Sequence, residues 1–233
     1  GIRVPEGKGG KPASTVRPAK ELLDIEEKFL DDILEGKRDP LPTIRKALMD
    51  HIITCGVRWW RNWNGTKRPE KPSLDEIERS SDYKHHSSMV HLSLKQTCHK
   101  KIRTMIQEMW NDIKTDFESF DAESSPDDHP FRDRWTRQIE RTRYLITNHP
   151  ELPFDDIRYF MSKCIEITEK PIYNPKTMTT FSGNPWVYLL NSNTKDKDAF
   201  GMKLDYRKEA PSKTRAKKSA VAVGGNILSR GLT

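Results

Sequence analysis

Apolar side chains recur at three- and four-residue steps through most of residues 18–170, and this spacing constrains the fold more than any other feature. The longest series runs between Ser88 and Phe120. It keeps these residues on one face: Leu94, Cys98, Ile102, Met105, Met109, Ile113 and Phe117. A repeat near 3.6 residues is typical of an amphipathic α-helix. The sequence therefore predicts one long helix across this region and a mainly α fold.

Prolines, glycines and capping residues divide the same region into further helices. Ser73 and Glu76 have the spacing of a capping box, in which each side chain satisfies a backbone N–H of the other residue. Proline suits the first turn of a helix and glycine suits its end. Together these signals predict a helical bundle of about five helices. Its other segments are expected from Pro18 to Gly36, from Ile44 (after Pro40 and Pro42) to a break near Asn64–Gly65, after Ser73, from Pro130 to Asn148 and from Pro153 to Lys170.

The ends of the chain lack the helical period. We expect a basic N-terminal arm over residues 1–17, the helical body over 18–170, an irregular apolar segment docked on the body over 171–190, and a basic C-terminal arm over 191–233. Within the docked segment, Trp186–Leu190 suits either a short strand or an irregular contact with the bundle. The arms are rich in glycine, proline or small polar residues, so they have little to bury and are expected to be extended.

Positive charge is concentrated at these two ends. The whole sequence has 41 Lys and Arg against 34 Asp and Glu, a formal net charge of +7. Residues 1–20 hold +4 and residues 191–233 hold +6, so the part between them is close to −3. Basic arms on a mildly acidic body suit a polyanionic partner such as nucleic acid. Solubilising tails, or segments that dock within an assembly, are the alternative.

Three groups of residues are candidates for nucleic-acid binding. The first interleaves tryptophan with cations, which suits stacking on unpaired bases while the cations hold the backbone. The second places arginines along one face of the helix that follows Pro130. The third is a basic cluster near the C-terminus. The candidates are Arg58, Trp60, Arg61, Lys67 and Arg68 in the first group, Arg134, Arg137 and Arg141 in the second, and Lys213, Arg215, Lys217 and Lys218 in the third.

Structural roles compete with each of these interpretations. Trp59 and Trp63 are four residues apart, so they are expected to close the core end of their helix. The arginine face after Pro130 equally suits ion pairs with the acidic helices of this chain or of a neighbouring copy. The C-terminal cluster also fits a nuclear address.

The sequence contains no recognised catalytic or metal-binding motif. His51, Cys55, Cys98 and His99 are candidates for a zinc site, but adjacent helical residues point about 100° apart, and paired Cys/His motifs of short spacing are missing. The sequence also lacks a phosphate-binding glycine loop and a Gly-x-Ser-x-Gly nucleophile motif. We therefore expect no enzyme, no cofactor and no metal. A metal-dependent enzyme that uses acid pairs such as Asp155–Asp156 is the least favoured alternative.

The cysteine count and the hydropathy bear on compartment. Three cysteines cannot all pair internally, which favours a reducing compartment, cytoplasmic or nuclear, or the inside of a virus-like particle. No apolar run approaches the ~20 residues that a membrane span needs.

The function expected from these observations is structural. The chain is expected to coat or package RNA, or another single-stranded nucleic acid, and to assemble with copies of itself, as a coat or nucleocapsid protein does. The alternative is a helical, non-catalytic subunit of a larger protein or ribonucleoprotein complex.

Overall fold

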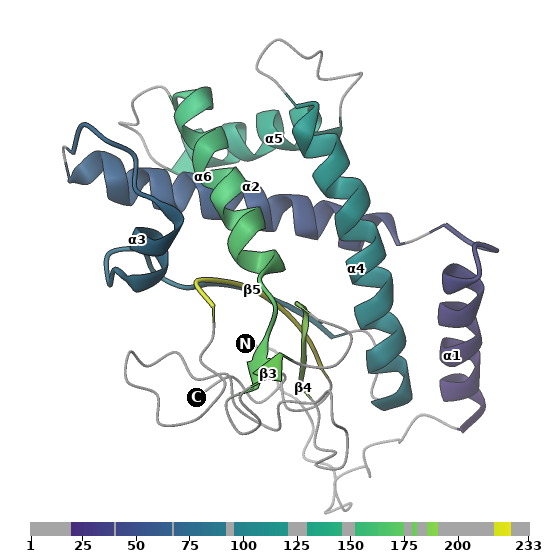
Figure 1. Cartoon of the computed structure of the whole chain (residues 1–233). Helices are drawn as coiled ribbons and strands as arrows, with labels where there is room; N and C mark the ends of the chain where they lie inside the picture. The colour runs from purple at the N-terminus through teal and green to yellow at the C-terminus, as the bar shows by residue number, and fades with distance from the viewer. Residues whose placement is uncertain are drawn as a thin grey trace, which may run out of the picture.

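The computed structural model describes residues 20–39, 41–66, 68–91, 96–120, 130–145, 152–174, 179–180, 186–190 and 217–224. Within these ranges it holds six helices and a small amount of sheet, so the predicted mainly α fold is confirmed (Figure 1). The helices are α1 (Lys20–Leu34), α2 (Pro42–Gly65), α3 (Leu74–Arg79), α4 (Gln96–Glu118), α5 (Pro130–Leu145) and α6 (Phe154–Glu169). The expected N-terminal arm, residues 1–17, lies outside the described residues.

Local sequence signals account for several helix ends. α2 has a proline in its first turn, where the missing N–H is not needed. At the start of α3, the Ser73 hydroxyl accepts from the Glu76 N–H at 3.3 Å, and Glu76 Oε2 accepts from the Ser73 N–H at 2.7 Å, so the predicted capping box is confirmed. Gly36 follows α1 with φ of +71°, a conformation that glycine adopts without strain.

The centre of the fold is the crossing of α2 and α6 (Figure 1). Ile52 and Trp59 of α2 and Phe160 of α6 are completely buried there. The two helices approach closely at Gly56, where a Cβ atom would lie 2.5 Å from Met161 Cγ and 3.2 Å from the Ile157 carbonyl oxygen. Only a residue without a side chain fits this crossing without a shift of the neighbours.

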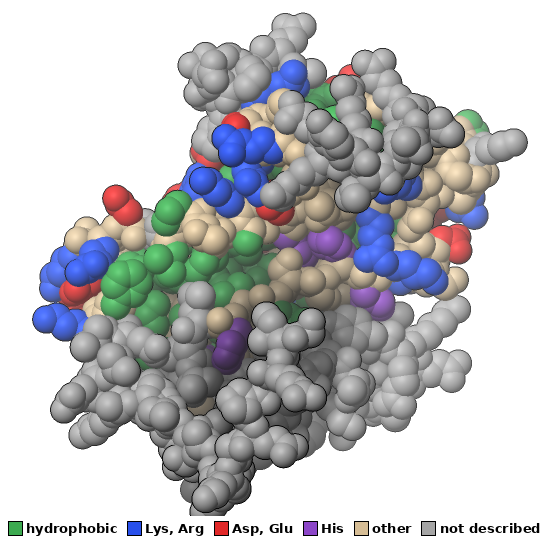
Figure 2. All heavy atoms as spheres, turned by 180° about the vertical axis from the view of Figure 1, so that it is seen from behind, with side chains coloured by type: hydrophobic (Ala, Val, Ile, Leu, Met, Phe, Trp, Pro, Cys, Tyr) green, Lys and Arg blue, Asp and Glu red, His purple; other side chains and the backbone are tan. Residues whose placement is uncertain are grey.

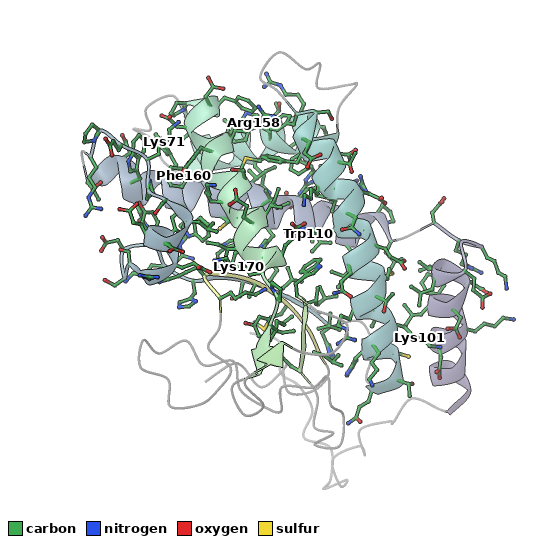
Figure 3. The ribbon with its side chains drawn as sticks, viewed as in Figure 1. Lys71, Lys101, Trp110, Arg158, Phe160 and Lys170 are labelled. Carbon is green, nitrogen blue, oxygen red and sulfur yellow. The ribbon has the colours of Figure 1, made fainter. Side chains whose placement is uncertain are left out.

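α4 and α1 extend the bundle to one side. Leu30 and Ile33 of α1 are buried in the common core, and Lys101 of α4 bridges to Glu27 at 3.3 Å and Asp31 at 2.5 Å (Figure 3). On α4, the buried Trp110 donates from Nε1 to Glu169 of α6 at 3.2 Å. Among the described residues, no helix combines the length and apolar character needed to cross a bilayer.

A parallel sheet lies against α2, α4 and α6, and this part of the fold differs from the sequence expectation. β5 (Ser219–Gly224) is its central strand, between β1 (His86–Val90) and β4 (Tyr188–Leu190). All six residues of β5 are buried. Two short antiparallel strands, β2 (Tyr173–Asn174) and β3 (Thr179–Thr180), form a separate pair.

The sheet corrects two expectations. The helix predicted between Ser88 and Phe120 begins only at Gln96, because Ser88 to Val90 pair with Val221 to Val223 instead. The segment Ser219–Gly224, assigned to the C-terminal arm, is a buried strand. Its alternation of small and β-branched residues suits a strand covered on both faces. The short strand considered for Trp186–Leu190 is confirmed at Tyr188–Leu190.

Candidate nucleic-acid interface

The C-terminal half of α2 lies alongside residues 82–86, the segment that leads into β1, and is hydrogen-bonded to it. Three side chains of α2 donate to carbonyl oxygens of this segment. Arg58 Nη1 donates to His85 at 2.9 Å, Trp59 Nε1 to Lys84 at 3.2 Å, and Asn62 Nδ2 to Asp82 at 2.7 Å. These hydrogen bonds hold Lys84 beside α2. We refer to Arg58, Arg61 and Lys84 as the α2 basic strip.

The α2 basic strip combines three cations without a carboxylate partner in the part of the chain that the structure describes. Arg58 and Arg61 are three residues apart on the helix and therefore lie on the same side of it. Arg58 and Lys84 are exposed, and Arg61 is partly buried. Figure 2 shows a face of the molecule on which histidine side chains lie beside a group of Lys and Arg side chains. Repulsion within such a group is relieved by a bound anion.

The other members of the first predicted group have different positions. Trp60 is only 4% exposed and belongs to the core, so its indole offers no open face for a base, and the expected stacking role is wrong in this conformation. Trp59 is also buried, as predicted. Arg68 is exposed, whereas Lys67 lies outside the described residues.

The arginines of α5 are largely neutralised by carboxylates of the same chain. Arg134 forms a bidentate ion pair with Asp50 of α2, in which Nε donates to Oδ1 at 2.9 Å and Nη2 donates to Oδ2. Arg137 Nε donates to Asp133 Oδ1 at 2.7 Å, one turn away on the same helix. Arg141 lies in α5, but its side chain is outside the described part. The pairing alternative therefore accounts for Arg134 and Arg137.

The C-terminal cluster is also engaged within the fold. Lys217 Nζ donates to the carbonyl oxygens of Thr168 at 2.6 Å, Lys170 at 2.7 Å and Trp186 at 3.3 Å, which joins β5 to the end of α6. Burial lowers the pKa of Lys217 to about 7. Lys218 is 7% exposed and donates to the Ser80 carbonyl at 2.8 Å. Neither ammonium group is available to a phosphate. Lys213 and Arg215 lie outside the described residues.

Sequence reasoning missed a polar cluster that is buried between α2, α6 and the sheet. Its centre is Ser219 of β5, whose Oγ lies 2.9 Å from His51 Nε2, 3.3 Å from Cys164 Sγ and 2.5 Å from Thr168 Oγ1. His51 Nδ1 lies 2.8 Å from Ser88 Oγ of β1. The neighbouring His86 ring is 4.6 Å from the His51 ring, and burial lowers the pKa of His86 to about 3.

The contact between Ser219 and His51 has the distance of a nucleophile and its general base. Ser219 is completely buried, however, and the second nitrogen of His51 meets a serine hydroxyl where a catalytic triad has a carboxylate. The cluster instead satisfies polar groups at the point where β1, β5, α2 and α6 meet. Only the tertiary structure brings these residues together, since they come from four distant parts of the chain.

The candidate zinc residues do not form a metal site in the described part of the chain, where no group of three or more His, Cys, Asp or Glu residues is placed to hold a metal ion. Cys55, Cys98 and Cys164 are free and buried. Burial raises the pKa of the Cys55 thiol. His99 is also buried, with 2% of its surface exposed.

Comparison with known families places most of the fold in one group. The family model described as the Z1 domain matches residues 43–233, which includes everything from α2 to the end of the chain. α1 lies before the matched region. No curated protein and no solved structure matches the chain.

Proposed function

We propose that this chain, which belongs to the Z1 domain family, binds single-stranded nucleic acid, with RNA as the expected form, through the α2 basic strip. The supporting observation is that Arg58 and Arg61 lie one turn apart on α2, the Lys84 backbone is bonded to the same helix, and none of the three has a carboxylate partner in the described chain. Arg134 and Arg45, in contrast, are each paired with carboxylates. Cations that a fold leaves unpaired in one place suit a phosphate backbone. The proposed role is binding, with no chemical step.

The coat or packaging role remains part of this proposal. The basic residues at the two ends of the sequence would add sequence-independent contacts to phosphates, and copies of the chain would assemble along the polymer. Three buried, free cysteines support the proposed reducing compartment.

Fluorescence anisotropy with a labelled single-stranded RNA tests the interface. The triple variant R58Q/R61Q/K84Q removes the strip, and Lys46→Gln is the matched control because Lys46 is an exposed cation at the other end of α2. For an interface of this kind, log K falls linearly with log salt, and each lost phosphate contact reduces the slope by about 0.7 for a single strand. We expect the triple variant to bind more weakly and with a smaller slope than the control. Equal binding by both variants would contradict the assignment to the strip.

Light scattering after size-exclusion chromatography tests assembly. A coat protein is expected to form large, homogeneous particles with RNA, and the ratio of absorbance at the nucleic-acid and protein bands reports the bound polymer. A single small species with and without RNA would instead support the helical subunit of a larger complex.

A further inference from the structure

We propose that the Nε–Nη2 edge of Arg61 binds one phosphodiester oxyanion, and we refer to this binding site as the Arg61 seat. This inference rests on the proposed function, because it assigns a specific contact within the α2 basic strip. It goes beyond the proposed function because it assigns a bidentate contact to one side chain, whereas nucleic-acid binding by the strip as a whole requires only positive charge.

Arg134 and Arg61 differ in whether the guanidinium atoms Nε and Nη2 have acceptors within the described part of the chain. In Arg134, Nε and Nη2 each donate to one carboxylate oxygen of Asp50. In Arg61, the corresponding Nε and Nη2 are both buried, and neither has a hydrogen-bond partner among the described residues. A guanidinium removed from water without an acceptor is unfavourable, since it loses its hydration and gains nothing in return. The Arg61 edge therefore has the geometry and the unsatisfied donors that a planar pair of oxygens would complete.

The surroundings of Arg61 favour an acceptor with more than one negative charge along its length. Arg58 uses one guanidinium nitrogen on the His85 carbonyl and remains exposed to solvent, and Lys84 is held beside it. A single carboxylate would neutralise only one of these three cations. A phosphodiester chain offers successive oxyanions, of which one binds the Arg61 edge and its neighbours lie near Arg58 and Lys84.

Access to this edge depends on the conformation of the Arg61 side chain itself. Arg61 as a whole is partly exposed, although its Nε and Nη2 are buried. A phosphate would reach the edge after a rotation of this long side chain, and it would then supply the acceptors that the described part of the chain does not. The same turn of α2 contains a second buried donor, Trp60 Nε1, for which the described part of the chain offers no acceptor.

The variant R61K separates geometry from charge, because lysine keeps the positive charge and loses the planar edge. Arg79→Lys is the matched control, since it makes the same exchange at an exposed arginine of α3 that lies outside the α2 basic strip. We expect R61K to weaken binding of a single-stranded RNA by about tenfold, a loss typical of one bidentate arginine contact. R79K is expected to change the affinity by less than about threefold. Circular dichroism of each variant establishes that it folds.

A second probe separates the seat from the proposed function. Inorganic phosphate is expected to raise the melting temperature of the wild type and to have a smaller effect on R61K. RNA binding by the wild type with no loss in R61K overturns the seat and leaves the proposed function standing. Stabilisation by phosphate that depends on Arg61, with no RNA binding, supports the seat and overturns the proposed function. Absence of both responses overturns both.

Discussion

Replacing Gly56 with alanine tests the crossing of α2 and α6, on which the arrangement of the whole core depends. The new methyl group would lie 2.5 Å from Met161 Cγ, and 3.2 Å from both the Ile157 carbonyl oxygen and the Met161 backbone nitrogen. Met161 is completely buried, so it has little room to move aside. The backbone contacts persist whichever rotamer Met161 adopts. The helices must therefore separate by several tenths of an ångström.

Two effects of opposite sign determine the magnitude. Overpacking of a tight core costs about 1–3 kcal/mol, and the shortest contact at Gly56 places this site toward the upper end. Alanine in place of glycine within a helix gains roughly 0.8–1 kcal/mol of helix propensity. We expect G56A to lower the free energy of unfolding by about 1–2 kcal/mol. Urea denaturation followed by far-UV circular dichroism measures this difference.

Gly65 provides the matched control in the same helix. A Cβ at Gly65 would meet nothing within 4 Å, so G65A is expected to leave stability unchanged or raise it by up to about 1 kcal/mol. The double variant G56A/M161A adds a further check, because removal of Met161 should cost less when the clash is already present. If G56A is as stable as G65A, the close approach of α2 and α6 is refuted.

Three further predictions concern the polar contacts. S219A is expected to cost about 2–3 kcal/mol in urea denaturation, because it leaves buried partners such as His51 unsatisfied, whereas the less buried Ser88→Ala should cost less. Asp50→Ala leaves the Arg134 guanidinium without its acceptor and should cost about 1–3 kcal/mol at low salt, and no change in the urea midpoint would contradict this pairing. The His86 pKa of about 3 lies below the ordinary value of 6.5, so the unfolded chain takes up a proton that the folded chain does not. His86 therefore does not destabilise the folded state above pH 6.5, and the free energy of unfolding falls by at most roughly 5 kcal/mol as the pH falls toward 3. The free energy of unfolding of H86Q should depend less on pH across this window.

Helices were predictable because the information for them is local. The apolar period, Pro130 and the Ser73–Glu76 capping box lie within or next to the elements that they define, and α3 and α5 begin where these signals place them. The clustering of tryptophan with arginine near the end of α2 was also visible, and Arg58 and Arg61 remain in the proposed interface. Lys84 was missed because its position depends on hydrogen bonds from α2 to a segment beyond α3.

The sheet, the polar cluster and the pairing of cations were decided by the tertiary structure alone. The backbone of β5 is hydrogen-bonded to β1 and β4, so the position of β5 depends on strands that are far away in the chain. The residues Ser219–Gly224 carry no local signal that identifies these partner strands. The charged residues also divide into features that the sequence determines and features that only the fold determines. The number of arginines and their helical faces follow from the sequence. Within the described residues, however, Arg134 has a carboxylate and Arg61 has none, because folding brings Asp50 to Arg134. Electrostatic pairing acts over a few ångströms of space, and that distance is set by packing between helices rather than by separation along the chain.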